Sequence, residues 1–406
     1  MSSNLTSILE SHVAQDDNTK DKLLGAAFIL VNKDTTLFSG STGKINQPFS
    51  TSADFTTASF AWVASMTKLL TSICALQLVQ RNLLTLDQDL RPLIPEFAKA
   101  QILRGFDESG TQPILEPNAS PLNLRQLLSH TSGYVYDMMH PDLAKWAELN
   151  GHNQHAWNRA ALDTPLVFVP GKEGGWAYGT STDWAGIVVE EISGQSLGEY
   201  MRENLFEPLG IKDSTFKSKE ISAQLEARKV RISFRTTEGN ALEVGDGPSP
   251  VEGFEKESGG AGLWTTAEDY AKVLKAVLKA GSAEEGGILS QELVDEMFRP
   301  QLNGEQTVTL RKEMEKSPIA PEYKGVEDAE ANFGLAGALN LKDLPGRRKK
   351  GSMMWSGIAN SHWWIDRESG VAGVLFVSVM PFGDPVVDEL YRELETAVYE
   401  EFVTKA

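Results

Sequence analysis

The chain has 406 residues, which is long enough for two domains or for one large domain with an insertion. Its 41% hydrophobic residues support a large core, and its formal net charge of -18 argues against nucleic acid or an anionic membrane as the main partner. The single cysteine, Cys74, excludes an intrachain disulfide. Because the sequence shows neither a secretory signal pattern nor a stretch of membrane-spanning length, we expect a soluble cytoplasmic protein without a membrane partner.

The first predicted elements are a short helix and a pair of strands. Residues Leu5 to Val13 have the apolar spacing of an amphipathic helix. The apolar run Gly25 to Val31 predicts a buried strand, and Thr35 to Ser39 predicts a strand that returns beside it after a turn. The chain therefore begins with sheet-forming segments.

A long apolar helix comes next, and it begins at a serine. Small and apolar residues lead up to Ser65, and an apolar pattern at helical spacing continues to about Asn82. Lys68 lies one turn further along the same face, so its amine can reach the Ser65 hydroxyl. A serine needs a nearby base to act as a nucleophile, and a helix N-terminus adds positive potential where an oxyanion would form.

The pattern Ser-x-x-Lys is common, and this chain contains it at Ser41, Ser65 and Ser214. Ser41 and Ser214 lie in segments that resemble turns, whereas Ser65 opens a long helix. On this context alone, a catalytic Ser65 and a plain N-cap serine both remain open.

The middle of the chain is predicted to be mostly helical. His130 ends a short helix, and we interpret it as a structural loop anchor because the chain has no G-x-S-x-G elbow. Tyr178 lies between glycines just before a helix, so its side chain either points into a cleft or packs beneath the loop. The spacing of His140, His152 and His155 fits no metal motif, so we expect no metal.

The C-terminal part returns to strands. A charged stretch from Pro300 to Glu330 is expected to be a surface excursion. Four strands are then predicted, within Phe333 to Leu339, Gly351 to Met354, Ser361 to Asp366 and Gly370 to Met380, before a closing helix over Asp384 to Phe402. Strands at both ends with helices between them predict an α/β (α+β) fold. Its antiparallel sheet domain would span 1–80 and 250–406, and a mostly helical domain would span 81–249.

Several motifs occur together in a fixed order. They are Ser65-Met66-Thr67-Lys68, LLSHTSG at 127–133, Trp176-Ala177-Tyr178, Asp183-Trp184-Ala185-Gly186, PLGI-DSTF at 208–216, Gly259 to Leu263 with Asp269-Tyr270, and Trp355-Ser356-Gly357. With these motifs the chain resembles the serine β-lactamase-like family: class C β-lactamases, related esterases and, above all, the statin side-chain transesterase group. The resemblance covers residues 20 to 400 approximately and implies the β-lactamase-like fold.

The resemblance also implies roles for individual residues. Ser65 would attack an acyl carbonyl, and Lys68 and Tyr178 would share the proton transfers. The backbone N–H groups of Ser65 and Ile358 would form the oxyanion hole. The implied substrate-binding residues are Trp176, Trp355, Ser356, Gly357 and Tyr134. No cofactor is implied.

Two departures from the β-lactamase pattern matter. Tyr178 is followed by Gly179-Thr180 where β-lactamases have Tyr-x-Asn, and Trp355-Ser356-Gly357 stands where they have Lys-Thr-Gly. The missing lysine favours a neutral or hydrophobic acyl substrate. We therefore expect a serine esterase or acyltransferase that acts on an ester or thioester of a hydrophobic small molecule in secondary metabolism.

Alternatives remain open. A β-lactamase or a D-Ala-D-Ala carboxypeptidase-like amidase would use the same nucleophile, whereas a non-catalytic binding protein would be expected to lose Ser65, Lys68 or Tyr178. Whether water or an alcohol acceptor removes the acyl group is not decided by the sequence. The basic run Arg347 to Lys350 is either a solvated hairpin end or a docking site for an acyl carrier protein.

Overall fold

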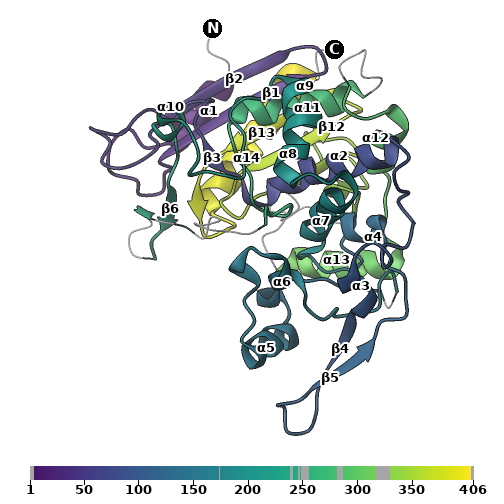
Figure 1. Cartoon of the computed structure of the whole chain (residues 1–406). Coiled ribbons are helices and arrows are strands. Elements are labelled where there is room, and N and C mark those ends of the chain that lie inside the picture. Colours follow the sequence, from purple (N-terminus) through teal and green to yellow (C-terminus); the bar gives the residue numbers. More distant parts are fainter. Residues whose placement is uncertain are drawn as a thin grey trace.

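A seven-stranded antiparallel sheet takes its strands from both ends of the chain (Figure 1). The computed structural model describes residues 4–172, 174–237, 241–245, 247, 256–280, 287–316 and 330–403. The strand order is β2-β1-β13-β12-β11-β10-β9. Their bounds are β1 Gly25–Asn32, β2 Thr36–Gly43, β9 Ala331–Phe333, β10 Ala338–Asn340, β11 Met353–Ser356, β12 His362–Asp366 and β13 Val371–Phe376.

Pairing between distant segments decides where these strands end. β2 continues to Gly43, beyond the predicted end at Ser39, because it pairs with β1 as far as Gly25. On its other side β1 pairs with β13, from Ala27 opposite Phe376 to Asn32 opposite Val371. The predicted strand Gly370 to Met380 is split, because β14 (Val379–Met380) leaves the large sheet and pairs with β6 (Ile232–Arg235). β7 (Leu242–Gly245) completes this smaller sheet.

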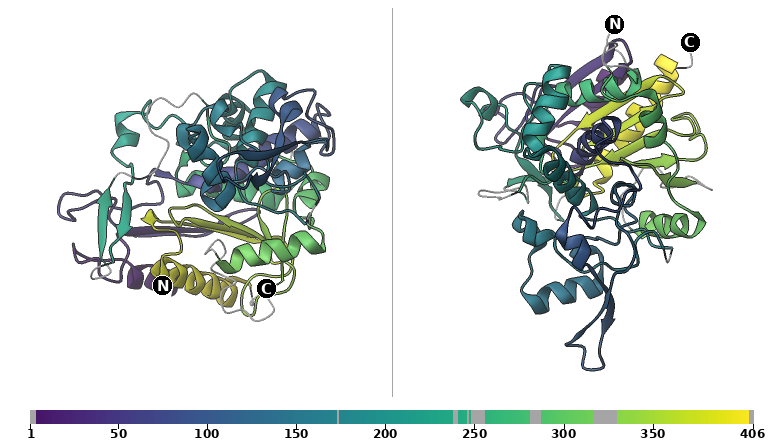
Figure 2. Two further views of the ribbon diagram at one scale, coloured as in Figure 1. Left: turned by 90° about the horizontal axis from the view of Figure 1, so that it is seen from below. Right: turned by 45° about the vertical axis from the view of Figure 1, so that its right-hand side comes forward.

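Helices cover both faces of the large sheet. α1 (Asn4–His12) and α14 (Pro385–Val398) pack together on one face, where Tyr391 contacts Trp364. α11 (Ala267–Lys279) lies on the other face against β1 and β13, with Tyr270 near Phe376. In the left view of Figure 2 the sheet separates α14 from most of the remaining helices. The domain limits stay a prediction.

α2 (Thr67–Gln80) is the central helix of the helical part, and its residues from Thr67 to Leu78 are all buried. It packs against α7 (Ser181–Ser193) and α8 (Leu197–Met201). The other helices are α3 Pro95–Lys99, α4 Leu124–Leu128, α5 Pro141–Asn150, α6 Arg159–Leu162, α9 Glu207–Leu209, α10 Ala223–Glu226, α12 Gln291–Met297 and α13 Gly304–Lys316. In the described part of the chain, no helix is both long and apolar enough to cross a membrane.

Two segments have structure that the sequence did not predict. The stretch after α3 forms a hairpin of β4 (Gln101–Phe106) and β5 (Pro113–Pro117), which projects from the body at the bottom of Figure 1. Within the expected excursion from Pro300 to Glu330, residues Gly304 to Lys316 form α13, which buries Leu310 in the core. Residues 317–329 of that excursion lie outside the described part.

The basic run Arg347 to Lys350 is not solvated along its whole length. Arg348 is fully buried beneath the sheet, where its Nε lies 3.0 Å from the buried Glu395 of α14. Arg347 is also largely buried and pairs with the same carboxylate. Only the second half of the run reaches solvent, and Lys349 there pairs with Asp343 at 2.9 Å. A buried charge needs such a partner, so the two arginines in the first half of the run form part of the packed interior.

A buried histidine on the same face makes folding sensitive to acid. His362 of β12 is fully buried against Tyr391, and neither ring nitrogen has a hydrogen-bond partner in the described residues. Burial lowers the pKa of His362 to about 3. As the pH falls below about 6.5, His362 therefore binds a proton in the unfolded chain but stays neutral in the folded protein.

We expect His362→Phe to reduce the loss of stability in acid. His362 should lower the free energy of unfolding by about 1.4 kcal/mol per pH unit between about pH 6.5 and pH 3, and phenylalanine removes that dependence while keeping the ring. Urea unfolding at several pH values measures the slope. The exposed His155→Phe is the control and should keep the wild-type slope. An unchanged slope in His362→Phe would contradict the assignment.

Candidate active site

Ser65 lies in a single 3-10 turn, Ala64–Met66, immediately before α2. The approach to this turn is held by β3 (Ala61–Trp62), which pairs with β8 (Trp264–Thr265). Thr67 adds a clamp, because its hydroxyl donates to the Ala64 carbonyl and accepts from the Leu263 N–H. Ser65 therefore lies in the turn that leads directly into α2, and α2 directs its N-terminal end toward it.

Lys68 is the buried cation of the site. Its side chain is 3% exposed, and its Nζ donates to Ser65 Oγ at 3.3 Å, to Tyr136 Oη at 3.2 Å and to the Gly260 carbonyl at 2.8 Å. An ammonium group has three donors, so these contacts satisfy it. The contacts hold the charged nitrogen next to the serine hydroxyl.

Two tyrosines stand beside this lysine. The Tyr178 ring centroid is 4.6 Å from Lys68 Nζ, and the Tyr178 hydroxyl accepts a 3.1 Å hydrogen bond from Trp355 Nε1. Tyr136 comes from a loop that packs against the Tyr178 segment. Gly179 permits this approach, because a Cβ there would lie 2.3 Å from Val135 Cα. Burial raises the pKa of Tyr136 well above its ordinary value.

A glycine-rich loop supplies the carbonyl that holds Lys68. Asp183 of α7 accepts hydrogen bonds from the Ser258 hydroxyl and the Gly260 N–H, and Thr71 of α2 donates to the Gly259 carbonyl. Burial raises the pKa of Asp183, and the nearby Lys68 opposes that shift. The loop is thus fixed from both helices.

The end of β11 closes the site from the sheet. Gly357 packs against the chain before Ser65, since a Cβ there would lie 2.4 Å from the Val63 carbonyl oxygen. β11 is not an edge strand, because β10 and β9 lie beyond it in the sheet. However, β10 pairs only with Met353 and Met354. Trp355 and Ser356 therefore line the cavity although their strand lies inside the sheet.

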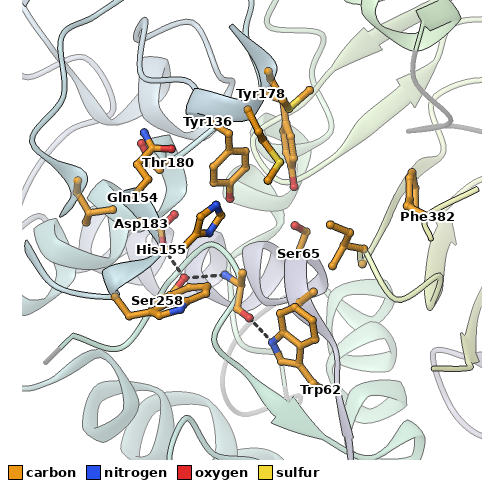
Figure 3. Close-up of a pocket in the computed structure, with 18 of the residues that line it drawn as sticks. Trp62, Ser65, Tyr136, Gln154, His155, Tyr178, Thr180, Asp183, Ser258 and Phe382 are labelled. Carbon is orange, nitrogen blue, oxygen red and sulfur yellow. Dashed lines mark hydrogen bonds between the residues drawn. The ribbon is translucent and has the colours of Figure 1, made fainter. Parts of the chain in front are cut away.

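Ser65 opens into a cavity of about 630 Å³ (Figure 3). Among the residues to which the resemblance assigns a role, Tyr178, Trp355, Ser356, Gly357 and Ile358 line this cavity. The other lining residues are Trp62, Ala64, Tyr136, Met138, Met139, Gln154, His155, Trp157, Asn158, Leu162, Thr180, Asp183, Ile187, Lys256, Glu257, Ser258, Ala261, Met380, Pro381 and Phe382. Apolar side chains make up much of this wall, as is typical of small-molecule sites.

Two residues expected to bind substrate lie elsewhere. Trp176 is buried against His130 and Phe333, and Tyr134 packs between Phe97 and Trp184. Neither is among the described residues that line the cavity, so both belong to the core. Both residues stand beside a motif, but that position in the sequence does not show in which direction the ring points.

His130 lies behind Tyr178, with ring centroids 4.9 Å apart. Burial, together with the charge of Lys68, holds the pKa of His130 well below its ordinary value, so the ring is neutral. It supports the tyrosine loop, because its carbonyl accepts from the Ala177 N–H at 3.0 Å. This position agrees with a structural role.

Sequence reasoning missed the far walls of the cavity. No recognisable sequence spacing links Ser65 to the segments that form these walls, which are Tyr136, the loop around Gln154 to Asn158 and the segment Met380 to Phe382. The one available signal was the aromatic residue three positions after LLSHTSG. Only the folded chain shows that Tyr136, and not Tyr134, reaches Lys68.

Comparison with known proteins identifies the family. A family model described as beta-lactamase matches residues 9–397. A monacolin J acid methylbutanoyltransferase from Aspergillus terreus is 36% identical over 347 residues, which are 84% of this chain and 82% of the relative. A lovastatin esterase from Penicillium rubens is 34% identical over 349 residues, which are 84% of this chain and 85% of the relative.

A solved structure agrees with these relatives. The unliganded simvastatin synthase from Aspergillus terreus matches with a TM-score of 0.87 and 30% identity, over 98% of each chain. The predicted β-lactamase-like fold and enzyme class, a serine hydrolase or acyltransferase, are confirmed. The relatives transfer or cleave esters, and they do not support the carboxypeptidase alternative. The chain therefore belongs to the beta-lactamase family.

Proposed function

We propose that this enzyme transfers an acyl group through an ester bond to Ser65. The observation that supports this most directly is the triple contact of Lys68, which holds a cation against the Ser65 hydroxyl at the wall of an apolar cavity. A serine that served only as a helix cap would not need a buried ammonium beside it.

In the first step, Ser65 Oγ attacks the carbonyl carbon of an ester or thioester. Tyr178 takes the hydroxyl proton, with Lys68 beside it, and passes a proton to the departing alcohol or thiol. Two groups favour negative charge on the Tyr178 oxygen: the Trp355 N–H at 3.1 Å and the ammonium that faces its ring. The carbonyl oxygen would lie between the N–H groups of Ser65 and Ile358, whose two chain segments meet where Gly357 packs against Val63.

In the second step, an alcohol or water attacks the acyl-Ser65 carbonyl. Tyr178 now takes the proton of the attacking hydroxyl, and Ser65 leaves with a proton restored to its oxygen. A large apolar cavity suits an organic alcohol better than water, because the alcohol gains contact area there. We therefore propose transfer to an alcohol as the main reaction and hydrolysis as a side reaction.

The names of the relatives suggest the substrate class. Two of them carry a methylbutanoyl group in their names, and one cleaves lovastatin by name. We propose a short branched or linear acyl donor and a bulky alcohol acceptor, in secondary metabolism within the cytoplasm.

An acyl carrier protein remains a candidate donor, but the basic run gives it little support. Arg347 and Arg348 are tied to Glu395, which leaves only Lys349 and Lys350 to meet a partner. A free thioester is the simpler donor.

We expect Ser65→Ala to abolish ester turnover. Removing the nucleophile should lower kcat/KM by roughly 10³-fold or more, while the melting temperature stays near wild type. A chromogenic butanoate ester measures the rate. Ser41→Ala is the matched control, because Ser41 also stands in a Ser-x-x-Lys pattern but lies exposed on β2. Turnover by Ser65→Ala at the Ser41→Ala rate would rule out the mechanism.

Comparison of the two tyrosines tests the proton transfer. Tyr178→Phe should lower kcat by roughly 10²-fold or more, the usual contribution of a general acid–base group. Tyr136→Phe removes only one partner of Lys68 and should reduce kcat less. A larger loss in Tyr136→Phe would assign the proton to Tyr136 instead.

The fate of the acyl group is measured by intact-protein mass. After mixing with a butanoyl thioester, wild type should gain one butanoyl group and Ser65→Ala none. Hydrophobic alcohols should then remove the adduct faster than water alone. If water removes the adduct and added alcohols do not increase the rate, the enzyme is a hydrolase rather than an acyltransferase.

A further inference from the structure

The cavity has two chemically different arms on either side of Ser65. In Figure 3, Asp183 and Ser258 lie on one side of Ser65, and Phe382 lies on the opposite side. We call the first the acidic arm (Asp183, Lys256, Glu257 and Ser258) and the second the apolar arm (Ile358, Met380, Pro381 and Phe382). A substrate that fills both arms meets two different environments.

The apolar arm joins two segments through one asparagine. Asn360 donates its side-chain amide hydrogens to the carbonyls of Val379 and Pro381, at 2.7 and 2.8 Å. This holds Ile358 next to Met380 and Phe382. The arm offers aliphatic and aromatic contact without a charged group among its four residues.

The acidic arm holds charges, but its positive charge is already paired. Lys256 is the only lysine or arginine among the described residues that line the cavity. Its Nζ binds Glu190 of α7 at 2.8 Å, and the Glu190 side chain is only 11% exposed. Asp183 is engaged with Ser258 and Gly260 and faces the charge of Lys68. His155 lines the cavity but is exposed, so water screens its ring.

Glu257 adds a further carboxyl group to this arm. It accepts a hydrogen bond from the Gly198 N–H, and burial raises its pKa. In neither protonation state does it offer positive charge to a ligand. A carboxylate brought into this arm would lose its hydration and find no unpaired cation, which is costly.

We propose that the alcohol acceptor of this enzyme is uncharged, and that the Lys256–Glu190 pair excludes acceptors that carry a carboxylate. The inference rests on the proposed acyl transfer, because it names the substrate class of the same cavity. It sets this chain apart from relatives whose names specify acids as acceptors, monacolin J acid and ML-236A carboxylate. The reacting hydroxyl of the acceptor must still reach Ser65. The acidic arm therefore selects for the charge on the rest of the acceptor molecule.

Binding to Ser65→Ala tests this without any chemistry. The probes are monacolin J in its neutral lactone form and in its ring-opened acid form, measured by isothermal titration calorimetry. We expect the lactone to bind at least roughly tenfold more tightly than the acid, since the acid must be desolvated without a partner. Equal affinities, tighter binding of the acid, or no binding of the lactone would overturn the proposal.

A matched pair of variants, each combined with Ser65→Ala, tests the role of the ion pair. Glu190→Gln keeps a hydrogen-bonding side chain but frees the charge of Lys256, so it should raise the affinity for the acid by roughly threefold or more. Glu191→Gln removes the neighbouring charge, which pairs with Arg159 outside the cavity lining, and should leave both affinities unchanged. Equal effects of the two variants would overturn the role of the pair.

The same comparison in the active enzyme separates this inference from the proposed function. Acyl-enzyme formed with a butanoyl thioester should be discharged faster by the lactone than by the acid. Failure to form any adduct would refute the acyl-Ser65 mechanism, whereas the calorimetric preference would still decide the charge of the ligand.

Discussion

The need to satisfy one buried ammonium group governs the geometry of this site. Removing a charged amine from water costs several kcal/mol unless its donors find partners. Lys68 meets that need with the Ser65 hydroxyl, the Tyr136 hydroxyl and the Gly260 carbonyl, and the last of these lies 192 residues away along the chain. Each partner is itself held by a separate packing arrangement. A small displacement of any of the three segments would therefore move Lys68 relative to the Ser65 oxygen that reacts.

An indole in place of a cation changes what the sheet contributes to the site. Trp355 stands where the β-lactamase pattern has lysine, and its N–H donates a hydrogen bond to the Tyr178 oxygen. The sheet thereby supports the proton-transfer residue and presents an apolar surface to the substrate. Together with the neutralised Lys256, this leaves the described cavity wall without an unpaired lysine or arginine. Trp355 and the acidic arm thus support the proposed preference for uncharged substrates for separate reasons.

The sequence was most informative where chemistry depends on neighbours in the chain. Ser65 and Lys68 are one helical turn apart, and glycines near Tyr178 and Trp355 mark close approaches of backbone, so local spacing and the order of the motifs could propose these four residues as site candidates. Strand patterns at both ends likewise predicted the antiparallel sheet. Tyr136 was not predictable, because its contact with Lys68 depends on how a distant loop packs. Aromatic character alone failed for Trp176 and Tyr134, whose rings point into the core, and strand order required pairing that no local pattern encodes.

The sheet built from both ends of the chain has a consequence during protein synthesis. When the ribosome has completed α2, the apolar strand β1 has its neighbour β2 but still lacks β13, and Lys68 lacks the carbonyl that will hold it. Both arrive only after the helical part has been made. Contacts between such distant segments form slowly, and the exposed apolar edge invites association with other nascent chains or with chaperones. An active enzyme molecule is therefore evidence that its C-terminal strands have been translated and joined to the sheet.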